Sequence, residues 1–232
     1  FNADSIQSKG IEVNVGDIRD TSLVATLVAK STAVVQLAAQ ASVPLSVENP
    51  EETMEINVQG TQNVIDSCLE NGVKRLVVAS SAAVYGAAET LPLKEEASGD
   101  LLAPYSESKW ANEQQRIEAR SKGLQASCLR FFNVYGAGQR SDGTYAAVIP
   151  KFVDMMAQGI SPRINGDGLQ TRDFIHVDDV CNAIMAFIEG DWKAESHHVY
   201  NVATEKKISL LELVSVINTS LTKKVPEYVP VK

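Results

Sequence analysis

Hydrophobic residues in the first half of the chain alternate between short runs and longer stretches with helical spacing. Four short runs are predicted to form strands: Ile11–Val15, Ala33–Ala38, Arg75–Ser80 and Gln125–Phe131. Between them, apolar residues recur at the spacing of helices over residues 23–30, 51–71 and 105–122. The run at 75–80 is almost entirely apolar, which is typical of a strand buried on both faces. This alternation predicts an α/β fold with a doubly wound parallel sheet.

The second half of the chain has a different pattern. Two segments rich in glycine and polar residues are predicted to form loops over a ligand site: 136–144 and 159–173. Two further helices are predicted on either side of a short strand, His198–Val202; they cover residues 178–189 and 209–220. We therefore expect the main sheet over residues 1–135 and a smaller, interleaved C-terminal lobe over residues 136–232.

Composition and charge exclude several classes of protein. The net charge is −8 over 232 residues, which argues against a protein that binds nucleic acid through a basic stripe. No apolar stretch approaches the ~20 residues that span a bilayer, and the chain does not start like a signal peptide, so we expect no membrane association and a cytoplasmic location. The three cysteines are far apart and are expected to be buried free thiols: Cys68, Cys128 and Cys181. The histidines (His176, His197 and His198) lack metal-ligand spacing, so no metal site is expected.

The strongest chemical signal is a tyrosine and a lysine four residues apart, Tyr105 and Lys109, within a predicted helix. This spacing places both side chains on one face. A nearby ammonium favours the phenolate form of a tyrosine and lowers its pKa, so that the tyrosine can act as a base. Taken alone, this spacing more often means a partly buried tyrosine that packs over the stem of a lysine.

The strand at 75–80 strengthens the catalytic interpretation. About 25 residues before Tyr105, this strand runs out into Ser80 and Ser81. In open α/β sheets ligands bind at the carboxyl ends of the strands. A serine hydroxyl at that position can complete a Ser–Tyr–Lys relay.

These residues stand in an ordered series of seven segments. The segments are 16–20 (GDIRD), 37–44 (LAAQASVP), 57–61 (NVQGT), 80–86 (SSAAVYG), the pair Tyr105 and Lys109, 130–136 (RFFNVYG) and 166–180 (GDGLQTRDFIHVDDV). On them the chain resembles the extended short-chain dehydrogenase/reductase family, and within it the UDP-glucose and UDP-N-acetylglucosamine 4-epimerases. The resemblance covers essentially all of the chain. It implies a Rossmann-like NAD-binding domain at 1–135 and a substrate-binding lobe at 136–232.

The resemblance also implies roles at the cofactor and at the reacting sugar. Ser81 and Tyr105 would be the acid/base pair at the C4 hydroxyl, and Lys109 would tune Tyr105 and bind the nicotinamide ribose. The remaining residues expected around NAD are Asp17 and Ile18 at the adenine, Leu37, Ala38 and Ala39 along the cofactor, and Asn57, Ser80 and Phe132.

On the nucleotide-sugar side, the resemblance implies that Asn133 and Arg172 bind the diphosphate. The guanidinium of Arg172 suits phosphate oxygens in its own right, although a surface ion pair with Asp173 fits the sequence as well. Val148, Arg163 and Asn165 would line the uridine pocket, and Ser42 and Ser81 would contact the substrate.

The residues directly after Ser81, at the end of the predicted strand 75–80, indicate which reaction to expect. Related dehydratases and decarboxylases carry an acidic residue just after this serine or threonine position, whereas this chain has Ala82 and Ala83, which cannot transfer protons. We therefore expect NAD-dependent epimerisation of a UDP-sugar at C4 through a 4-keto intermediate. Segments 42–46 and 145–151 resemble the branch that acts on UDP-N-acetylhexosamines. The alternatives are an ADP-heptose 6-epimerase, a UDP-glucuronate decarboxylase-type relative and a catalytically silent fragment that binds nucleotide sugar or NAD.

Two expectations concern the extent and assembly of the protein. The glycine-rich turn of this family and the family's C-terminal end are not found in the sequence. We expect a truncated chain whose NAD site is completed by further sequence. By the same resemblance, two copies would form a homodimer through the helices at 51–71 and 104–122.

Overall fold

The computed structural model describes residues 2–88, 90–142, 146–193, 198–221 and 229–231. The chain divides into two compact units, which are considered separately. The first comprises Phe1–Phe131 and Cys181–Val202, and the second comprises Phe132–Val180 and Ala203–Lys232. The expected boundary at 135/136 is therefore wrong for 181–202, because a strand in this segment joins the sheet of the first unit.

The first unit contains the predicted parallel sheet. Its order is β1-β2-β3-β8, and every neighbouring pair is parallel. The strands are β1 (Ala33–Gln36), β2 (Arg75–Ser81), β3 (Gln125–Phe131) and β8 (Val199–Val202). The five inner residues of β2 and of β3 are all buried, as their apolar runs predict. The α/β class and the parallel sheet are confirmed.

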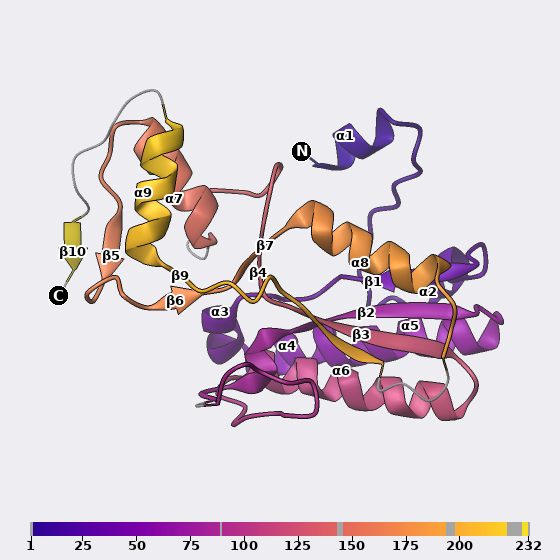
Figure 1. The fold of residues 1–232 in the computed structure, drawn as a ribbon. Helices are drawn as coiled ribbons and strands as arrows, with labels where there is room; N and C mark the ends of the chain where they lie inside the picture. Colours follow the sequence, from indigo (N-terminus) through magenta and orange to yellow (C-terminus); the bar gives the residue numbers. More distant parts are fainter. Residues whose placement is uncertain (1, 89, 143–145, 194–197, 222–228, 232) are drawn as a thin grey trace. The chain divides into compact units, whose positions relative to one another are not determined.

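Helices cover both faces of this sheet (Figure 1). On one side lie α5 (Gly60–Glu70) and α6 (Pro104–Ser121), and on the other lies α8 (Val177–Glu189). The hydrophobic core includes residues of α5, of α2 (Thr21–Val28), of β2 and of β3. Arg75 at the start of β2 caps the C-terminal end of α8. Its Nη1 donates to the carbonyls of Phe187 (3.1 Å) and Ile188. Terminal helix carbonyls need such partners.

Two elements of the first unit differ from the prediction. Residues 11–15 form no strand, and Val15 is 93% exposed. A strand requires a hydrogen-bonded neighbour, and among the described strands none pairs with this segment. The predicted helix at 51–71 is helical throughout but consists of three consecutive segments: the α-helix α4 (Pro50–Met54), the π-helical turn η1 (Glu55–Gln59) and the α-helix α5.

In its described residues, the second unit contains three two-stranded pairings and the two helices α7 (Val148–Ala157) and α9 (Leu210–Ser220). The parallel pairs are β4 (Asn133–Tyr135) with β7 (Phe174–His176), and β5 (Arg163–Asn165) with β10 (Val229–Val231). The antiparallel pair is β6 (Thr171–Arg172) with β9 (Ile208–Ser209). A second core joins α7 and α9. The segment 159–173 is therefore not only loop, since it contains β5 and β6.

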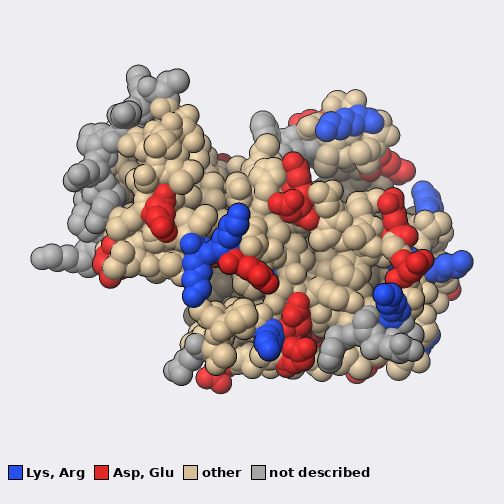
Figure 2. Space-filling view, in the orientation of Figure 1, with Lys and Arg blue, Asp and Glu red and all other residues tan. Residues whose placement is uncertain are grey.

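The described residues also form three shorter helical elements. They are α1 (Asn2–Gln7), α3 (Val43–Glu48) and the 3₁₀ helix η2 (Ala82–Tyr85). On the face shown in Figure 2, acidic and basic side chains are interspersed over the described residues. The prediction of three buried thiols is wrong for Cys181, which is exposed, because it lies about 100° around α8 from the buried Val180.

Two features are absent from the described part of the chain, a membrane-spanning helix and a metal-binding cluster. None of its helices combines the length and the apolar character that crossing a bilayer requires. Its histidine, cysteine, aspartate and glutamate side chains form no group of three or more suited to a metal ion, and His197 lies outside the described residues.

The contact between Arg75 and α8 generates a stability prediction. Arg75→Met leaves two helix-end carbonyls without their donor, so the free energy of unfolding should fall by about 1–3 kcal/mol. The matched control is Lys74→Met, at the exposed neighbouring position, which should change it by less than about 0.5 kcal/mol. Urea denaturation of both variants measures the difference. Equal losses of unfolding free energy in the two variants would contradict the role of Arg75 in capping α8.

Candidate active site

The first turn of α6 positions the predicted base. Pro104 occupies the first helical position, where its missing N–H costs nothing. The backbone N–H of Tyr105 donates to Oγ of Ser46 on α3 at 3.1 Å, and Ser46 is fully buried. The hydroxyl of Ser106 accepts from the backbone N–H of Ala103 at 3.1 Å. The backbone that carries Tyr105 is therefore held at two points.

Lys109 lies one turn further along α6 and is buried, with 3% of its surface exposed. Its Nζ donates to the carbonyl oxygen of Ala79 at 2.9 Å and lies 5.9 Å from the centre of the Tyr105 ring. Burial lowers the pKa of Lys109 to about 8. Ala79 precedes Ser81 by two residues, so this contact anchors α6 beside the serine.

The structure brings Ser81 and Tyr105 together. Burial raises the pKa of the Tyr105 phenol, and a hydrogen bond with the Ser81 side chain lowers it in part. The expectation that Lys109 leaves this pKa below its ordinary value is wrong, because the cost of burying the phenolate outweighs the favourable contacts. The Ser81 hydroxyl also accepts from the backbone N–H of Ala83 at 3.1 Å and caps η2.

Asn57 connects the segment after β1 to α6. Its Oδ1 accepts from the backbone N–H of Gln40 at 2.8 Å, and its Nδ2 donates to the Gln40 carbonyl at 3.0 Å. The same Nδ2 donates to Oγ of Ser108 at 2.9 Å, and the side chain is fully buried. The Asn57 carbonyl, within the π turn, accepts from Nδ2 of Asn112. Asn57 thus orders the polar shell around the site.

Asp17 and Ile18, the two residues expected at the adenine, do not follow a strand, because residues 11–15 form none. The Asp17 carboxylate accepts from the backbone N–H of Arg19 at 2.8 Å and from its Nη2 at 2.6 Å, which lowers the pKa of Asp17 to about 2. The carboxylate therefore remains ionised at neutral pH. Ile18 packs against the core, and its carbonyl accepts from Nδ2 of Asn63 at 3.2 Å. An exposed anionic acceptor beside an apolar side chain fits an adenine amine and ring.

The end of β1 also fits a cofactor. Leu37 is 53% exposed although it is apolar, and Ala38 and Ala39 leave room for close approach. Ser80 behaves differently from this group. It is buried, alternates with Ser81 along β2, and donates from Oγ to Oε1 of Glu113 at 2.5 Å. Its hydroxyl is thus engaged inside the fold.

The predicted nucleotide-sugar residues of the second unit lie on three short strands, β4, β5 and β6, and at the start of α7. Arg163 and Asn165 are exposed on one face of β5, while Ile164 between them is buried in the core, and Val148 packs at the edge of that core. Phe132 is half-buried at the start of this unit, ahead of β4. Ser42, which belongs to the first unit, caps α3 by accepting from the backbone N–H of Leu45 at 3.2 Å.

Arg172 does not form the ion pair with Asp173 that was the alternative interpretation. The Asp173 carboxylate accepts from the backbone N–H and Oγ1 of Thr204, at 3.0 and 2.7 Å. The guanidinium of Arg172 is exposed, and its Nη1 donates to the carbonyl of Thr171. The neighbouring Asn133 donates from Nδ2 to the carbonyl of Asp173 at 2.8 Å. This arrangement leaves a guanidinium available for an anion.

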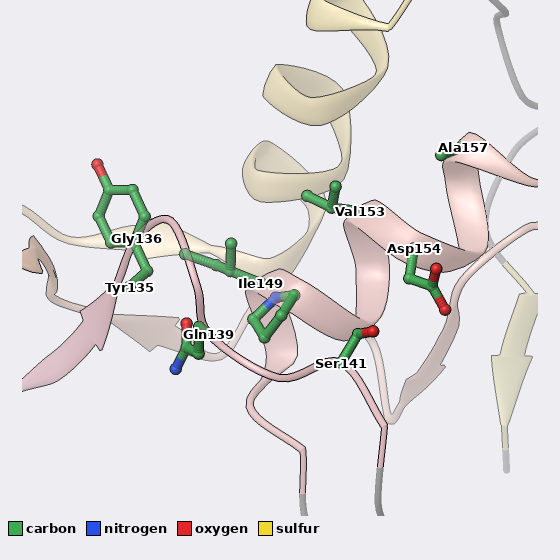
Figure 3. A pocket seen from close by; sticks show the side chains of 9 residues that line it. Tyr135, Gly136, Gln139, Ser141, Ile149, Val153, Asp154 and Ala157 are labelled. Carbon is green, nitrogen blue, oxygen red and sulfur yellow. The ribbon is translucent and has the colours of Figure 1, made fainter. Parts of the chain in front are cut away.

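A cavity of about 390 Å³ lies in the second unit beside α7 (Figure 3). None of the predicted substrate residues is part of its lining. The lining residues are Tyr135, Gly136, Gln139, Ser141, Ile149, Pro150, Val153, Asp154 and Ala157. They combine an apolar floor from one face of α7 with a polar rim.

Sequence reasoning missed the supporting residues of the site. Ser46, Gln40 and Glu113 carry hydrogen bonds on which the predicted residues depend. For Glu113 a signal was available, because it follows Lys109 by four residues and so lies on the same face of the helix.

The buried lysine leads to a pH-dependent stability prediction. In the folded protein the pKa of Lys109 is about 8, and in the unfolded chain it returns to its ordinary value of 10.5. The unfolded state therefore binds more protons between these two values, so the stability of the wild type rises with pH in that window. Relative to Lys109→Met, the gain should be roughly 2 kcal/mol between pH 8 and about pH 9.5.

Urea denaturation at the two pH values measures this gain. The control is Lys74→Met, which removes an exposed lysine and should keep the pH dependence of the wild type. A constant stability difference between wild type and Lys109→Met across the window would contradict the depressed pKa.

Comparison with known proteins agrees with this geometry. Residues 2–203 match the NAD dependent epimerase/dehydratase family. A Methanocaldococcus jannaschii protein whose name refers to UDP-glucose 4-epimerase is 39% identical over 219 residues, which are 93% of this chain and 70% of that protein. A UDP-N-acetyl-alpha-D-glucosaminuronate decarboxylase of Bacillus cytotoxicus is 31% identical over 207 residues, 87% of this chain and 63% of that enzyme.

A solved structure extends the comparison to the fold. The UDP-N-acetylglucosamine 4-epimerase of Methanobrevibacter ruminantium, in complex with UDP-N-acetylmuramic acid, superposes with a TM-score of 0.84 and 33% identity; the match covers 94% of this chain and 69% of that one. The chain thus spans between 63% and 70% of the length of these three relatives. The sheet, the Ser81–Tyr105–Lys109 arrangement and the match over residues 2–203 together show that the chain belongs to the NAD dependent epimerase/dehydratase family.

Proposed function

We propose that the protein catalyses the NAD-dependent epimerisation of a UDP-sugar at C4 through a 4-keto intermediate. The observation that carries the proposal is the contact of the Ser81 side chain, at the carboxyl end of β2, with Tyr105 on α6, beside the buried Lys109. Ala82 follows Ser81 directly. Relatives in the family include epimerases and a decarboxylase, so the choice of reaction depends on these residues.

The residues around the end of β1 are suited to hold the cofactor. Asp17 would accept a hydrogen bond from the adenine amine, and Ile18 would provide an apolar wall. The exposed Leu37, with Ala38 and Ala39, would lie along the dinucleotide, while Asn57 orders the segment that follows them. The proposal also places Phe132 near NAD and gives Ser80 a contact through its backbone. When bound, NAD supplies the removal and return of the hydrogen at C4.

Tyr105 performs the proton transfer in this proposal. Its phenolate oxygen takes the proton of the C4 hydroxyl as C4 is oxidised and returns it when the keto sugar is reduced on its other face. Ser81 donates a hydrogen bond that stabilises the phenolate. Because burial raises the pKa of Tyr105, the phenolate needs the nearby Lys109 in its charged form.

The residues after Ser81 favour epimerisation over elimination. Ala82 and Ala83 open η2, so neither of the two positions after Ser81 offers a carboxylate to expel a hydroxyl or to assist the loss of carbon dioxide. An epimerase requires only one base and a substrate that can be bound in two orientations. Tyr105 satisfies the first requirement, and the alanines after Ser81 add no competing acid chemistry.

The second unit supplies the proposed contacts to the nucleotide. The exposed guanidinium of Arg172 offers two parallel N–H donors to the diphosphate, with Asn133 beside it. Arg163 and Asn165 share the exposed face of β5 and would contact the uridine, with Val148 as an apolar wall. Ser42 joins the substrate contacts from the first unit.

UDP-N-acetylglucosamine and UDP-N-acetylgalactosamine are the proposed substrate pair. Segments 42–46 and 145–151 support this choice, although residue 145 lies outside the described residues. The solved relative that superposes with a TM-score of 0.84 is a UDP-N-acetylglucosamine 4-epimerase. UDP-glucose and UDP-galactose are the second pair to assay.

Removing the proposed base tests the mechanism. Tyr105→Phe should lower kcat for interconversion of either UDP-sugar pair by at least about 100-fold, because general base catalysis contributes that much. The control Tyr200→Phe removes another half-buried phenol of the first unit and should keep kcat within about twofold. Product ratios by chromatography measure both. Wild-type turnover in Tyr105→Phe would refute the assignment.

Arg172 provides a separate test of substrate binding. Arg172→Met should raise KM for the UDP-sugar by about 10-fold or more, since a charge-assisted bidentate contact contributes roughly 1.5–3 kcal/mol. Arg140→Met is the control, because Arg140 is also exposed in the second unit but pairs with Asp142 at 2.8 Å. An unchanged KM in Arg172→Met would show that the diphosphate lies elsewhere.

A further inference from the structure

Glu113 is a buried carboxylate on the same face of α6 as Tyr105 and Lys109. It lies four residues after Lys109, and only 2% of its side chain is exposed. Its Oε1 and Oε2 accept from Nε and Nη2 of Arg130 on β3, at 2.9 and 2.8 Å. The two-point contact fixes the plane of the carboxylate.

A third donor reaches the same carboxylate from β2. Oγ of Ser80 donates to Oε1 of Glu113 at 2.5 Å, and Ser80 is the residue directly before Ser81. One turn earlier on α6, Nζ of Lys109 donates to the carbonyl of Ala79. Two successive residues of β2 are thus bound by two successive turns of α6, immediately before the serine that contacts Tyr105.

Arg130 extends this arrangement to the other side of the serine. Its Nη1 donates to the carbonyl of Ala97 at 2.8 Å, and its guanidinium lies 4.6 Å from the ring centre of Tyr85 at the end of η2. The Tyr85 hydroxyl in turn donates to Oδ1 of Asn201 on β8 at 2.7 Å. The residues on both sides of Ser81 are therefore connected to one buried ion pair.

A buried ion pair adds little net stability, because desolvation of the two charges offsets their attraction. Its geometric effect is larger, since three directed donors allow the carboxylate one orientation. We propose that Glu113 is a positioning residue: through Ser80 and Arg130 it sets the register of α6 on β2 and so holds the Ser81 hydroxyl against the Tyr105 phenol. This inference rests on the proposed function of that pair.

The direct test is the titration of Tyr105 in the purified full chain. The ultraviolet absorbance of the phenolate, taken as the difference between a protein and its Tyr105→Phe counterpart, reports this group alone. In Glu113→Gln the pKa of Tyr105 should rise, because the hydrogen bond from Ser81 that lowers it is misaligned. The control Glu118→Gln makes the same change on the exposed face of α6 and should leave the titration unchanged.

Kinetics of the NAD-loaded protein provide the second readout. Glu113→Gln should lower kcat about 10-fold with KM within about twofold, because a small misplacement of a reacting group costs rate rather than binding. The acid limb of the kcat profile should move to higher pH. A loss of kcat that only follows the folded fraction, with an unchanged titration of Tyr105, would overturn the inference.

Ser80→Ala keeps the test decisive if Glu113→Gln does not fold. It removes only the link between β2 and the carboxylate and leaves the ion pair with Arg130 intact. As in Glu113→Gln, the pKa of Tyr105 should rise and kcat should fall. If neither the pKa nor kcat changed, the positioning role would be overturned. If Tyr105→Phe remained fully active, the proposed function would fail instead, while the titration would still decide the role of Glu113.

Discussion

Two contacts between α6 and the carboxyl end of β2 determine where chemistry can take place in the first unit. Lys109 binds the carbonyl of Ala79, and Glu113 accepts from Ser80, so that the next residue, Ser81, meets Tyr105. A strand end and a helix face must agree to within a fraction of an ångström for a hydroxyl to bond a phenol. The parallel sheet supplies the rigid half of this arrangement, because β2 pairs with β3 along its whole length from Arg75 to Ser81.

Burial has opposite consequences for the two titratable partners. It raises the pKa of Tyr105 and lowers that of Lys109 to about 8, because each shift avoids a charge inside the fold. Formation of the phenolate therefore depends on groups placed to stabilise it, namely the Ser81 hydroxyl and the Lys109 ammonium. Interactions in such a low-dielectric environment are stronger than in water, so small displacements have large effects.

The sequence predicted those parts of the structure that depend on local periodicity. The apolar runs of β2 and β3 and the four-residue spacing of Tyr105 and Lys109 are local patterns, and the structure confirms the strands and the shared helix face. Residues 11–15 look like a strand by composition, but a strand needs a partner that composition does not provide.

Contacts between residues that are far apart in the sequence could not be predicted from local patterns. Arg172 and Asp173 are neighbours in sequence, yet the carboxylate of Asp173 binds Thr204, 31 residues away. Glu113 and Arg130, 17 residues apart, meet only because α6 packs on β3. The boundary between the two units was misplaced for the same reason, since β8 returns to β3 late in the chain. The roles assigned to the cofactor and substrate residues stay predictions.

We propose that Tyr105 and Ser81 serve an oxidation and a reduction at C4 that end in epimerisation. Turnover of UDP-N-acetylglucosamine by the NAD-loaded protein in deuterated water tests it most directly, with nuclear magnetic resonance of the product sugar. We expect UDP-N-acetylgalactosamine with no solvent deuterium at any ring carbon, because the hydrogen removed from C4 is the one returned. Deuterium at C5, or a product that has lost water or carbon dioxide, would contradict it.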